Sequence, residues 1–191
     1  MGLPILCNSR PVVFLWEERV VEIHPESAKM FVVDEAVEKT KAAALRLLSM
    51  RAYTRKEIKD KLIKREFAAS AIDATLVALE RLTLLDDRVF ATRFVDEKLR
   101  LKPCGRMLLS RDLKRRGVPV EVIDEVMDEA FEAVDTAALA YEVLSGRARR
   151  YIGLERTKAM NRMYGFLARR GFDGAATREA TSRVWNEIEN Q

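Results

Sequence analysis

Few residues in this sequence have the type and spacing that would support catalysis. His24 is the one histidine and precedes Pro25 in the sequence HPES, which is typical of a solvated turn rather than of a metal ligand or general base. Cys104 lies between Lys102 and Arg106, whose charges could activate a thiol, but a small structural cysteine is the simpler interpretation. Both residues are therefore expected to be structural.

Two neighbouring carboxylates, Asp86 and Asp87, are the other candidates for a metal site. One aspartate that caps a helix and one that lies on the surface explain the pair more simply. The sequence contains no GxxxxGK[ST] phosphate loop, no GxGxxG and no HExxH. We therefore expect a protein that is not an enzyme and that has neither a metal nor a cofactor.

Arginine and lysine gather in two segments, and this charge pattern is the stronger functional signal. Residues 98–116 and 147–170 each hold eight basic residues and one acidic residue, whereas residues 121–135 hold seven acidic residues and no basic one. Such segregation predicts surfaces of opposite charge, which attract a charged partner. The candidate partner-binding residues are Arg100, Lys102, Arg106, Arg111, Lys114, Arg115, Arg116, Arg147, Arg149, Arg150, Arg162, Arg169 and Arg170.

The composition is that of a foldable, heavily charged helical protein. Of the 191 residues, 48% are hydrophobic and 34% are charged, and the 7% aromatic share and eight glycines argue against an all-β fold. No apolar run approaches the ~20 residues that cross a bilayer, and the N-terminus is a poor signal peptide. With Cys7 and Cys104 as the only cysteines, no disulfide framework is expected, and a reducing cytoplasm suits the chain.

One phrase occurs three times along the chain. It reads LIKREFAASAI from Leu62, LKRRGVPVEVI from Leu113 and LARRGFDGAAT from Leu167, so the copies start 51 and 54 residues apart. This period is typical of helical repeats. Because stacked repeats present a long surface without an obvious chemical centre, the repetition favours binding over catalysis.

Each repeat is predicted to contain three helices. In the first repeat, Thr54 and Glu57 form a capping-box pattern at the start of the second helix, which would bury Ile58, Leu62 and Ile63. In the later repeats, Gly117 and Gly171 have the position of glycines that end helices. Other apolar residues expected on the buried faces of helices include Ala44, Leu45, Leu47, Leu48, Ile72, Leu76, Leu79, Leu82, Val89, Phe90, Phe94 and Leu101.

The first residues follow a different pattern. Two runs of β-branched and aromatic residues flank the turn signal at residues 24–27, which predicts two strands or a hairpin. A lone hairpin is marginal in water, so we expect it to pack on the helices or on a partner. The expected divisions are a strand-rich extension over residues 1–38 and three-helix repeats over 39–85, 86–134 and 135–191.

From about residue 41 to residue 187 the chain resembles the RecX family of bacterial RecA regulators. The middle repeat carries the most specific part of the resemblance: Asp86–Asp87, Phe90–Ala91, the connector 102–105 and the segment Leu113–Gly117. The third repeat matches loosely through residues 169–172.

The first repeat resembles the family but departs from it at one position. Glu66 stands where glycine is common in the family. The matching residues in this repeat are Ala44, Leu45, Leu47, Leu48, Arg51, Glu57, Leu62 and Lys64.

The resemblance implies a mainly α fold in which three tandem three-helix repeats form an elongated, curved array with a short hairpin-like extension. RecX-like proteins lie in the groove of the RecA filament on single-stranded DNA, where they suppress ATP hydrolysis, strand exchange and the co-protease activity behind the SOS response. We therefore expect a cytoplasmic monomer that modulates DNA repair and homologous recombination. Its partner would be the RecA filament, with weak binding to single- or double-stranded DNA and none to a membrane.

Other functions remain open at this point. The main alternative is a stand-alone DNA-binding protein that competes for single-stranded DNA, although few aromatic residues (Tyr151, Tyr164 and Phe166) lie among the basic segments to stack bases. A helix-turn-helix reader of duplex DNA, a scaffold for an unrelated partner, and charges that serve only solubility are further alternatives.

Overall fold

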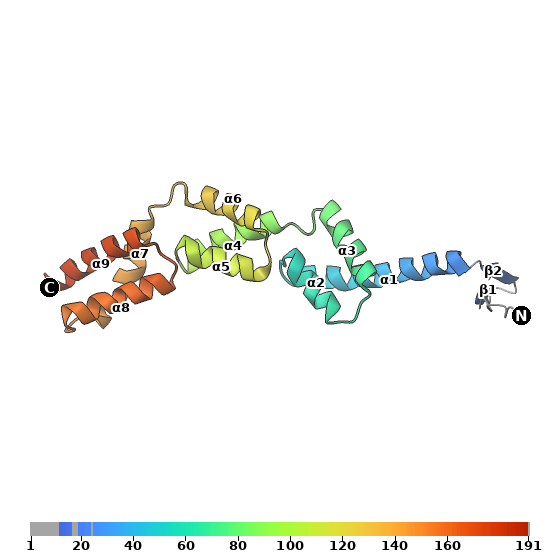
Figure 1. Ribbon diagram of the computed structural model, residues 1–191, viewed down its shortest axis with the longest axis horizontal. Coiled ribbons are helices and arrows are strands. Elements are labelled where there is room, and N and C mark those ends of the chain that lie inside the picture. Colours follow the sequence, from blue (N-terminus) through green and yellow to red (C-terminus); the bar gives the residue numbers. More distant parts are fainter. Residues whose placement is uncertain (1–11, 17–18, 24, 191) are drawn as a thin grey trace, which may run out of the picture. The chain divides into compact units, whose positions relative to one another are not determined.

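The computed structural model of the protein describes residues 12–16, 19–23 and 25–190, and is mainly α-helical in these ranges (Figure 1). The helices form three tandem three-helix repeats. They divide into two compact units, one that runs to Arg51 and resumes over Ile58–Leu84, and one made of Ala52–Glu57 and the chain from Leu85 onward. The described helices include none with the length and apolarity of a membrane span.

A hairpin is present near the N-terminus, but the sequence prediction placed its turn and second strand wrongly. Strands β1 (Val12–Trp16) and β2 (Arg19–Ile23) pair antiparallel, with Phe14 opposite Val21. The expected turn residue His24 lies outside the described residues. Residues 25–38, which were expected to be strand-rich, are helical.

Helix α1 (Pro25–Leu48) therefore begins well before the Lys39 expected from the apolar period. Proline is favoured at the first position of a helix because its missing N–H would be unpaired there in any case. The two valines of MFVV have a high strand propensity, which suggested a strand. Because strand propensity depends strongly on context, the helix start at Pro25 and the helical pattern after MFVV prevail over it.

The first repeat consists of α1, α2 (Arg55–Ile63) and α3 (Ala69–Arg81), and α1 packs on α3. Ile58 and Leu62 are buried as expected. Ile63 is 53% exposed, because it is one residue and so about 100° further round the helix than Leu62. Leu82 is 56% exposed because the helix has already ended. The expectation of burial is wrong also for Leu45, Val89 and Leu101, which are exposed.

The second repeat consists of α4 (Asp87–Leu101), α5 (Arg106–Arg116) and α6 (Val120–Phe131), and α6 contacts both of the other helices. Its core contains Val95, Leu109, Leu113, Ile123 and Met127, all of which are fully buried. The recurring leucine and the residue four positions before it therefore face the core, as the repeated phrase predicts.

The third repeat consists of α7 (Thr136–Ser145), the 3₁₀ helix η1 (Ala148–Arg150), α8 (Arg156–Arg169) and α9 (Gly174–Glu189). Helix α9 packs on α7 and α8, and Leu167 and Met163 are buried beneath it. Thr177, which replaces the isoleucine of the other two copies, is also buried, but its hydroxyl has no hydrogen-bond partner among the described residues.

The aspartate pair of the second repeat joins two helix starts. Asp86 caps α4 by accepting from the backbone N–H groups of Arg88 and Val89. Asp87 accepts from the backbone N–H of Arg55 at 2.8 Å, so it helps to satisfy the start of α2 and is more than a surface carboxylate. Thr54 accepts from the N–H of Glu57 at 3.1 Å, as the capping-box pattern predicts.

The second helix of every repeat ends in the same way. The residue four positions after the recurring leucine has a positive φ in all three copies: 61° at Glu66, 84° at Gly117 and 78° at Gly171. The next N–H then bonds back to the carbonyl of that leucine, as Phe67 does to Leu62 at 3.3 Å. This is the Schellman end, for which glycine is the preferred residue. The first repeat uses glutamate instead.

The end of α8 meets the start of α5 in a backbone-to-backbone contact, which we call the α5–α8 joint. The N–H of Gly105 donates to the carbonyl of Arg170 at 2.9 Å, and the N–H of Met107 donates to that of Gly171 at 3.2 Å. The unpaired donors at a helix start thus satisfy the unpaired acceptors at a helix end. A Cβ on Gly105 would lie 2.0 Å from the Gly171 carbonyl oxygen, so the contact requires glycine.

The end of α5 meets the start of α2 in a corresponding contact, the α2–α5 joint. The hydroxyl of Thr54 donates to the carbonyl of Arg116 at 2.7 Å, and the Arg116 guanidinium pairs with Glu57 at 2.7 Å. A Cβ on Gly117 would meet the side chain of Lys56 at 2.2 Å. This joint is therefore made of side chains, whereas the α5–α8 joint is made mainly of backbone.

Replacing Glu66 by glycine should stabilise the first repeat. A residue with a Cβ in the left-handed region destabilises the folded state by about 1–2 kcal/mol, and glycine removes this cost. Because glycine also gives the unfolded chain more conformational freedom, part of the benefit is lost, and we expect the free energy of unfolding to rise by about 1 kcal/mol. Native-state hydrogen exchange of the Phe67 amide measures this gain locally. Glu66→Ala is the matched control, because it removes the charge but keeps the Cβ. An equal gain in both variants would show that charge, and not backbone strain, is responsible.

Replacing Gly171 by alanine should break the α5–α8 joint. The new Cβ would lie 2.3 Å from the backbone nitrogen of Leu108 and on a residue with a positive φ. We expect a loss of about 2–4 kcal/mol, seen as faster exchange of the Met107 amide. Gly174→Ala is the control, because its Cβ has only the tip of Arg178 nearby, at 3.5 Å. If the Met107 amide is protected from exchange in Gly171→Ala as it is in the wild type, the α5–α8 joint is not formed as described.

Candidate interaction surface

Two of the candidate arginines make structural contacts at the joints. Arg116 pairs with Glu57 and lies over the rings of Phe90 and Phe94, with its guanidinium carbon 5.1 Å from the Phe94 centroid. Arg170 donates from Nη2 to the carbonyl of Pro103 at 2.6 Å. Each guanidinium is therefore used inside the fold, and the expectation that both face a partner stays a prediction.

Two further candidates are neutralised on the surface. Arg106 on α5 pairs with Asp128 on α6 at 2.6 Å, and Arg115 pairs with Asp112 at 3.3 Å. Both arginines are exposed, so these pairs are weak and are screened by salt. A partner could compete for either arginine, but only by displacing its carboxylate.

Helix α6 carries the acidic counterpart of the basic surface. Its exposed carboxylates are Glu121, Asp124, Glu125, Asp128 and Glu129, and the exposed Glu132 follows directly after its end. Arg88 at the start of α4 contacts two of them, with Nη2 2.6 Å from Glu129 and Nη1 in contact with Glu125. These carboxylates raise the pKa of Arg88, chiefly because Glu129 accepts a hydrogen bond from its guanidinium. Arg88 is not among the candidates predicted from the sequence, because its partners lie 37 and 41 residues away in the chain.

Most of the remaining candidates are exposed cations without an ion pair to any described residue. Arg111 and Lys114 lie on α5, and Arg162 and Arg169 lie on α8. The others of this kind are Arg100, Lys102, Arg149 and Arg150. Repeats two and three therefore each present unneutralised positive charge on or beside their second helix.

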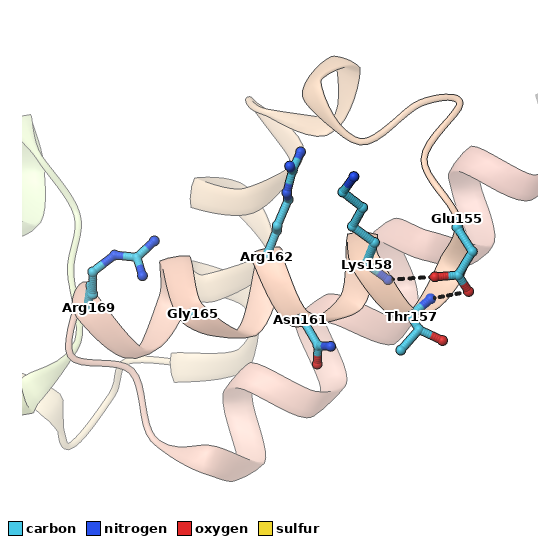
Figure 2. Close-up of a pocket in the computed structure, with 7 residues that line it drawn as sticks. All are labelled: Glu155, Thr157, Lys158, Asn161, Arg162, Gly165 and Arg169. Atoms are coloured by element: carbon cyan, nitrogen blue, oxygen red, sulfur yellow. Dashed lines mark hydrogen bonds between the residues drawn. The ribbon is translucent and has the colours of Figure 1, made fainter.

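The unneutralised charge on α8 lines a hollow of about 560 Å³ (Figure 2). Lys158, Arg162, Gly165 and Arg169 follow one another at spacings of four, three and four residues, so they share one stripe of the helix. Thr157, Asn161 and Glu155 complete the lining. In Figure 2 the side chains of Lys158 and Arg162 extend from the same side of α8. Arg162 and Arg169 are among the candidates predicted from the sequence, whereas Lys158 and Asn161 are not, although the helical spacing could have revealed them.

Glu155 closes the N-terminal end of this hollow. Its carboxylate accepts from the backbone N–H groups of Thr157 at 2.8 Å and Lys158 at 3.0 Å, and so caps α8. These hydrogen bonds hold the pKa of Glu155 below its ordinary value. The carboxylate is therefore ionised at neutral pH, and the positive charge is concentrated toward Arg162 and Arg169.

Arg147 is a candidate of a different kind, because it is held within the third repeat. Its guanidinium carbon lies 4.4 Å from the centroid of the Phe166 ring on α8, and its Nε is buried without a hydrogen-bond partner. Arg147 is half-buried and has no ion pair to a described residue. The ring of Phe166, the residue after Gly165 in α8, stabilises the Arg147 cation and holds it in place.

The candidates for chemistry have ordinary structural roles where the structure describes them. Cys104 is 2% exposed in the core of the second repeat, and burial raises the pKa of its thiol although Arg170 and Lys98 act against this. A buried, protonated thiol is a poor nucleophile, which supports the structural interpretation. Within the described ranges no group of three or more His, Cys, Asp or Glu side chains could hold a metal ion.

Family models match each of the three repeats. The model of the first three-helix domain of RecX matches residues 41–79, that of the second domain matches 86–127, and that of the third matches 134–181. Together these segments cover more than half of the chain and contain the three second helices.

Curated relatives agree with this assignment. The Regulatory protein RecX of Chlorobium phaeobacteroides (strain BS1) is 37% identical over 145 residues, which are 74% of this chain and 91% of the relative. The Regulatory protein RecX of Halorhodospira halophila (strain DSM 244 / SL1) is 36% identical over 147 residues, which are 77% of this chain and 89% of the relative. Their name describes a regulatory protein and is not that of an enzyme class.

Solved structures show the same fold at lower sequence identity. The crystal structure of RecX from Lactobacillus salivarius has a TM-score of 0.66 at 21% identity and covers 83% of this chain and 99% of its own. A second crystal structure of a regulatory protein RecX has a TM-score of 0.71 at 19% identity, over 91% of this chain and 81% of its own. From the three domain matches and the length and identity of the curated relatives, we conclude that the chain belongs to the RecX family of regulatory proteins.

Proposed function

We propose that this protein is a non-enzymatic regulator that binds the filament of RecA on single-stranded DNA. In doing so it inhibits ATP hydrolysis, strand exchange and co-protease activity, and thereby modulates DNA repair and the SOS response. The observation that carries the proposal is the match of all three repeats to the RecX family. The protein would act as a monomer in the cytoplasm, with repeats bounded near residues 85 and 134 as the binding modules.

The distribution of exposed charge supports binding to an extended, charged partner. Unneutralised cations occur on α5 and α8, in two different repeats, and the exposed carboxylates of α6 lie between these helices in the sequence. Several weak contacts made by linked modules give a combined affinity far above that of each contact alone, provided that the partner repeats the complementary sites. A filament built from identical subunits offers such repetition.

A second candidate is a protein that acts on DNA alone by sequestering single strands. The observation that favours it is α8, which carries four basic residues and no acidic one. One titration separates the two functions: hydrolysis of ATP by the cognate RecA on excess single-stranded DNA is measured at increasing amounts of this protein. Inhibition by substoichiometric protein that added DNA does not relieve supports action on the filament. Inhibition that added DNA reverses supports sequestration instead.

Reversing the free charges of α5 should weaken inhibition. Arg111→Glu with Lys114→Glu replaces two unpaired cations by anions, which an acidic partner surface would repel. We expect about a tenfold increase in the protein concentration for half-maximal inhibition, with an unchanged circular dichroism spectrum. The control, Arg93→Glu with Arg178→Glu, makes the same change in net charge at exposed residues outside the candidate set. Equal losses of inhibition in the two variants would mean that inhibition depends on net charge alone and not on the position of the charges.

A further inference from the structure

The stripe of α8 that lines the hollow has the dimensions of a short stretch of polymer backbone. At about 1.5 Å of rise per residue, Lys158 and Arg162 are separated by about 6 Å along the helix, and the row from Lys158 to Arg169 spans about 16 Å. A ligand that follows this row must therefore carry several negative charges in succession. A single small anion would engage only part of it.

The cations of this row have no ion pair to a described residue, whereas the corresponding helix of the second repeat carries both paired and unpaired cations. On α5, Arg106 and Arg115 have carboxylate partners. On α8, Lys158, Arg162 and Arg169 have no ion pair with any described residue, although carboxylates occur on the neighbouring helix α9. The row therefore retains its full charge for an external anion.

The rest of the lining favours a phosphodiester over an acidic protein. None of the seven lining residues is apolar or aromatic. The centre of a protein–protein interface is usually apolar and rich in aromatic residues, whereas phosphate oxygens are bound by Arg and Lys together with neutral donors such as Thr and Asn. Thr157 and Asn161 are such donors, although in Figure 2 their side chains extend from the other side of α8 than those of Lys158 and Arg162. The Arg169 guanidinium lies over Gly165, with Nη1 3.2 Å from the place that a Cβ on Gly165 would take.

Two neighbouring groups are not part of the proposed site. Glu155 accepts the backbone donors at the helix start, so the N-terminus of α8 itself is not the site. Arg147 is held on the Phe166 ring at 4.4 Å and does not line the hollow, so it is not counted in the row.

We propose that the row formed by Lys158, Arg162 and Arg169 binds the phosphodiester backbone of a nucleic acid strand. The proposal rests on the proposed function, because it names the DNA strand of the filament as the part that the third repeat meets. Binding through phosphates without aromatic stacking is independent of base sequence and depends strongly on salt. The third repeat thus provides a nucleic-acid contact within a protein whose other repeats meet the recombinase.

The test compares two variants of the full chain that have the same net charge. Arg162→Gln with Arg169→Gln removes two cations from the row, whereas Arg156→Gln with Arg178→Gln removes two exposed cations that do not line the hollow. Binding to a fluorescein-labelled oligothymidylate is measured by anisotropy between about 50 and 200 mM salt. The row variant should lose about 1.4 from the slope of log K against log salt, since each single-strand phosphate contact contributes about 0.7. Its affinity at low salt should fall by about tenfold to a hundredfold.

Each outcome bears on the proposal. An unchanged slope in the row variant, or an equal loss in the control variant, overturns it. Inhibition of RecA ATP hydrolysis is measured in parallel, so that the two proposals fail separately. If the row variant loses inhibition but binds the oligonucleotide as the wild type does, the row meets an acidic protein surface and the inference is wrong. If the wild type binds DNA through the row but does not inhibit, the inference holds and the proposed function fails.

Discussion

The meeting of one helix end with the next helix start is the interaction on which the second compact unit depends. A helix leaves unpaired N–H groups at its start and unpaired carbonyls at its end, and in this protein the two sets satisfy each other across repeats. The N–H groups of Gly105 and Met107 donate to the carbonyls of Arg170 and Gly171, and the hydroxyl of Thr54 donates to the carbonyl of Arg116. The geometry is possible because glycine both turns the chain and permits close approach.

These joints explain why neighbouring arginines have different roles. The repeated phrase places two basic residues before the turn in the second and third copies, and they lie about 100° apart around the helix. The second of each pair, Arg116 or Arg170, turns into the joint and is used there. The first, Arg115 or Arg169, stays exposed. Neighbouring arginines that look equivalent in the sequence therefore differ in the fold, because one of each pair makes a structural contact and the other stays exposed.

The available charge is further reduced by pairing between helices, and what remains is unevenly distributed. Carboxylates neutralise Arg106 and Arg115 on α5, while α8 keeps its row unpaired beside a hollow. A partner that binds Arg106 or Arg115 must therefore displace carboxylates of the protein itself, whereas a partner that binds Arg111, Lys114 or the α8 row need not. This difference separates the exposed cations into a paired and an unpaired set.

The repeats, their helices and the family could be predicted from the sequence, because apolar period, glycine position and capping residues act locally. Leu62, Leu113 and Leu167 are buried as the repeated phrase predicts, and Asp86 caps α4. Even the departure at Glu66 was visible, although its consequence, a positive φ, was not. The start of α1 was misjudged because local strand propensity in MFVV competes with a helix that continues on both sides. Which cations have ion-pair partners among the described residues could not be predicted, because partners such as Glu57 for Arg116 lie tens of residues away in the chain and meet only after the helices have packed.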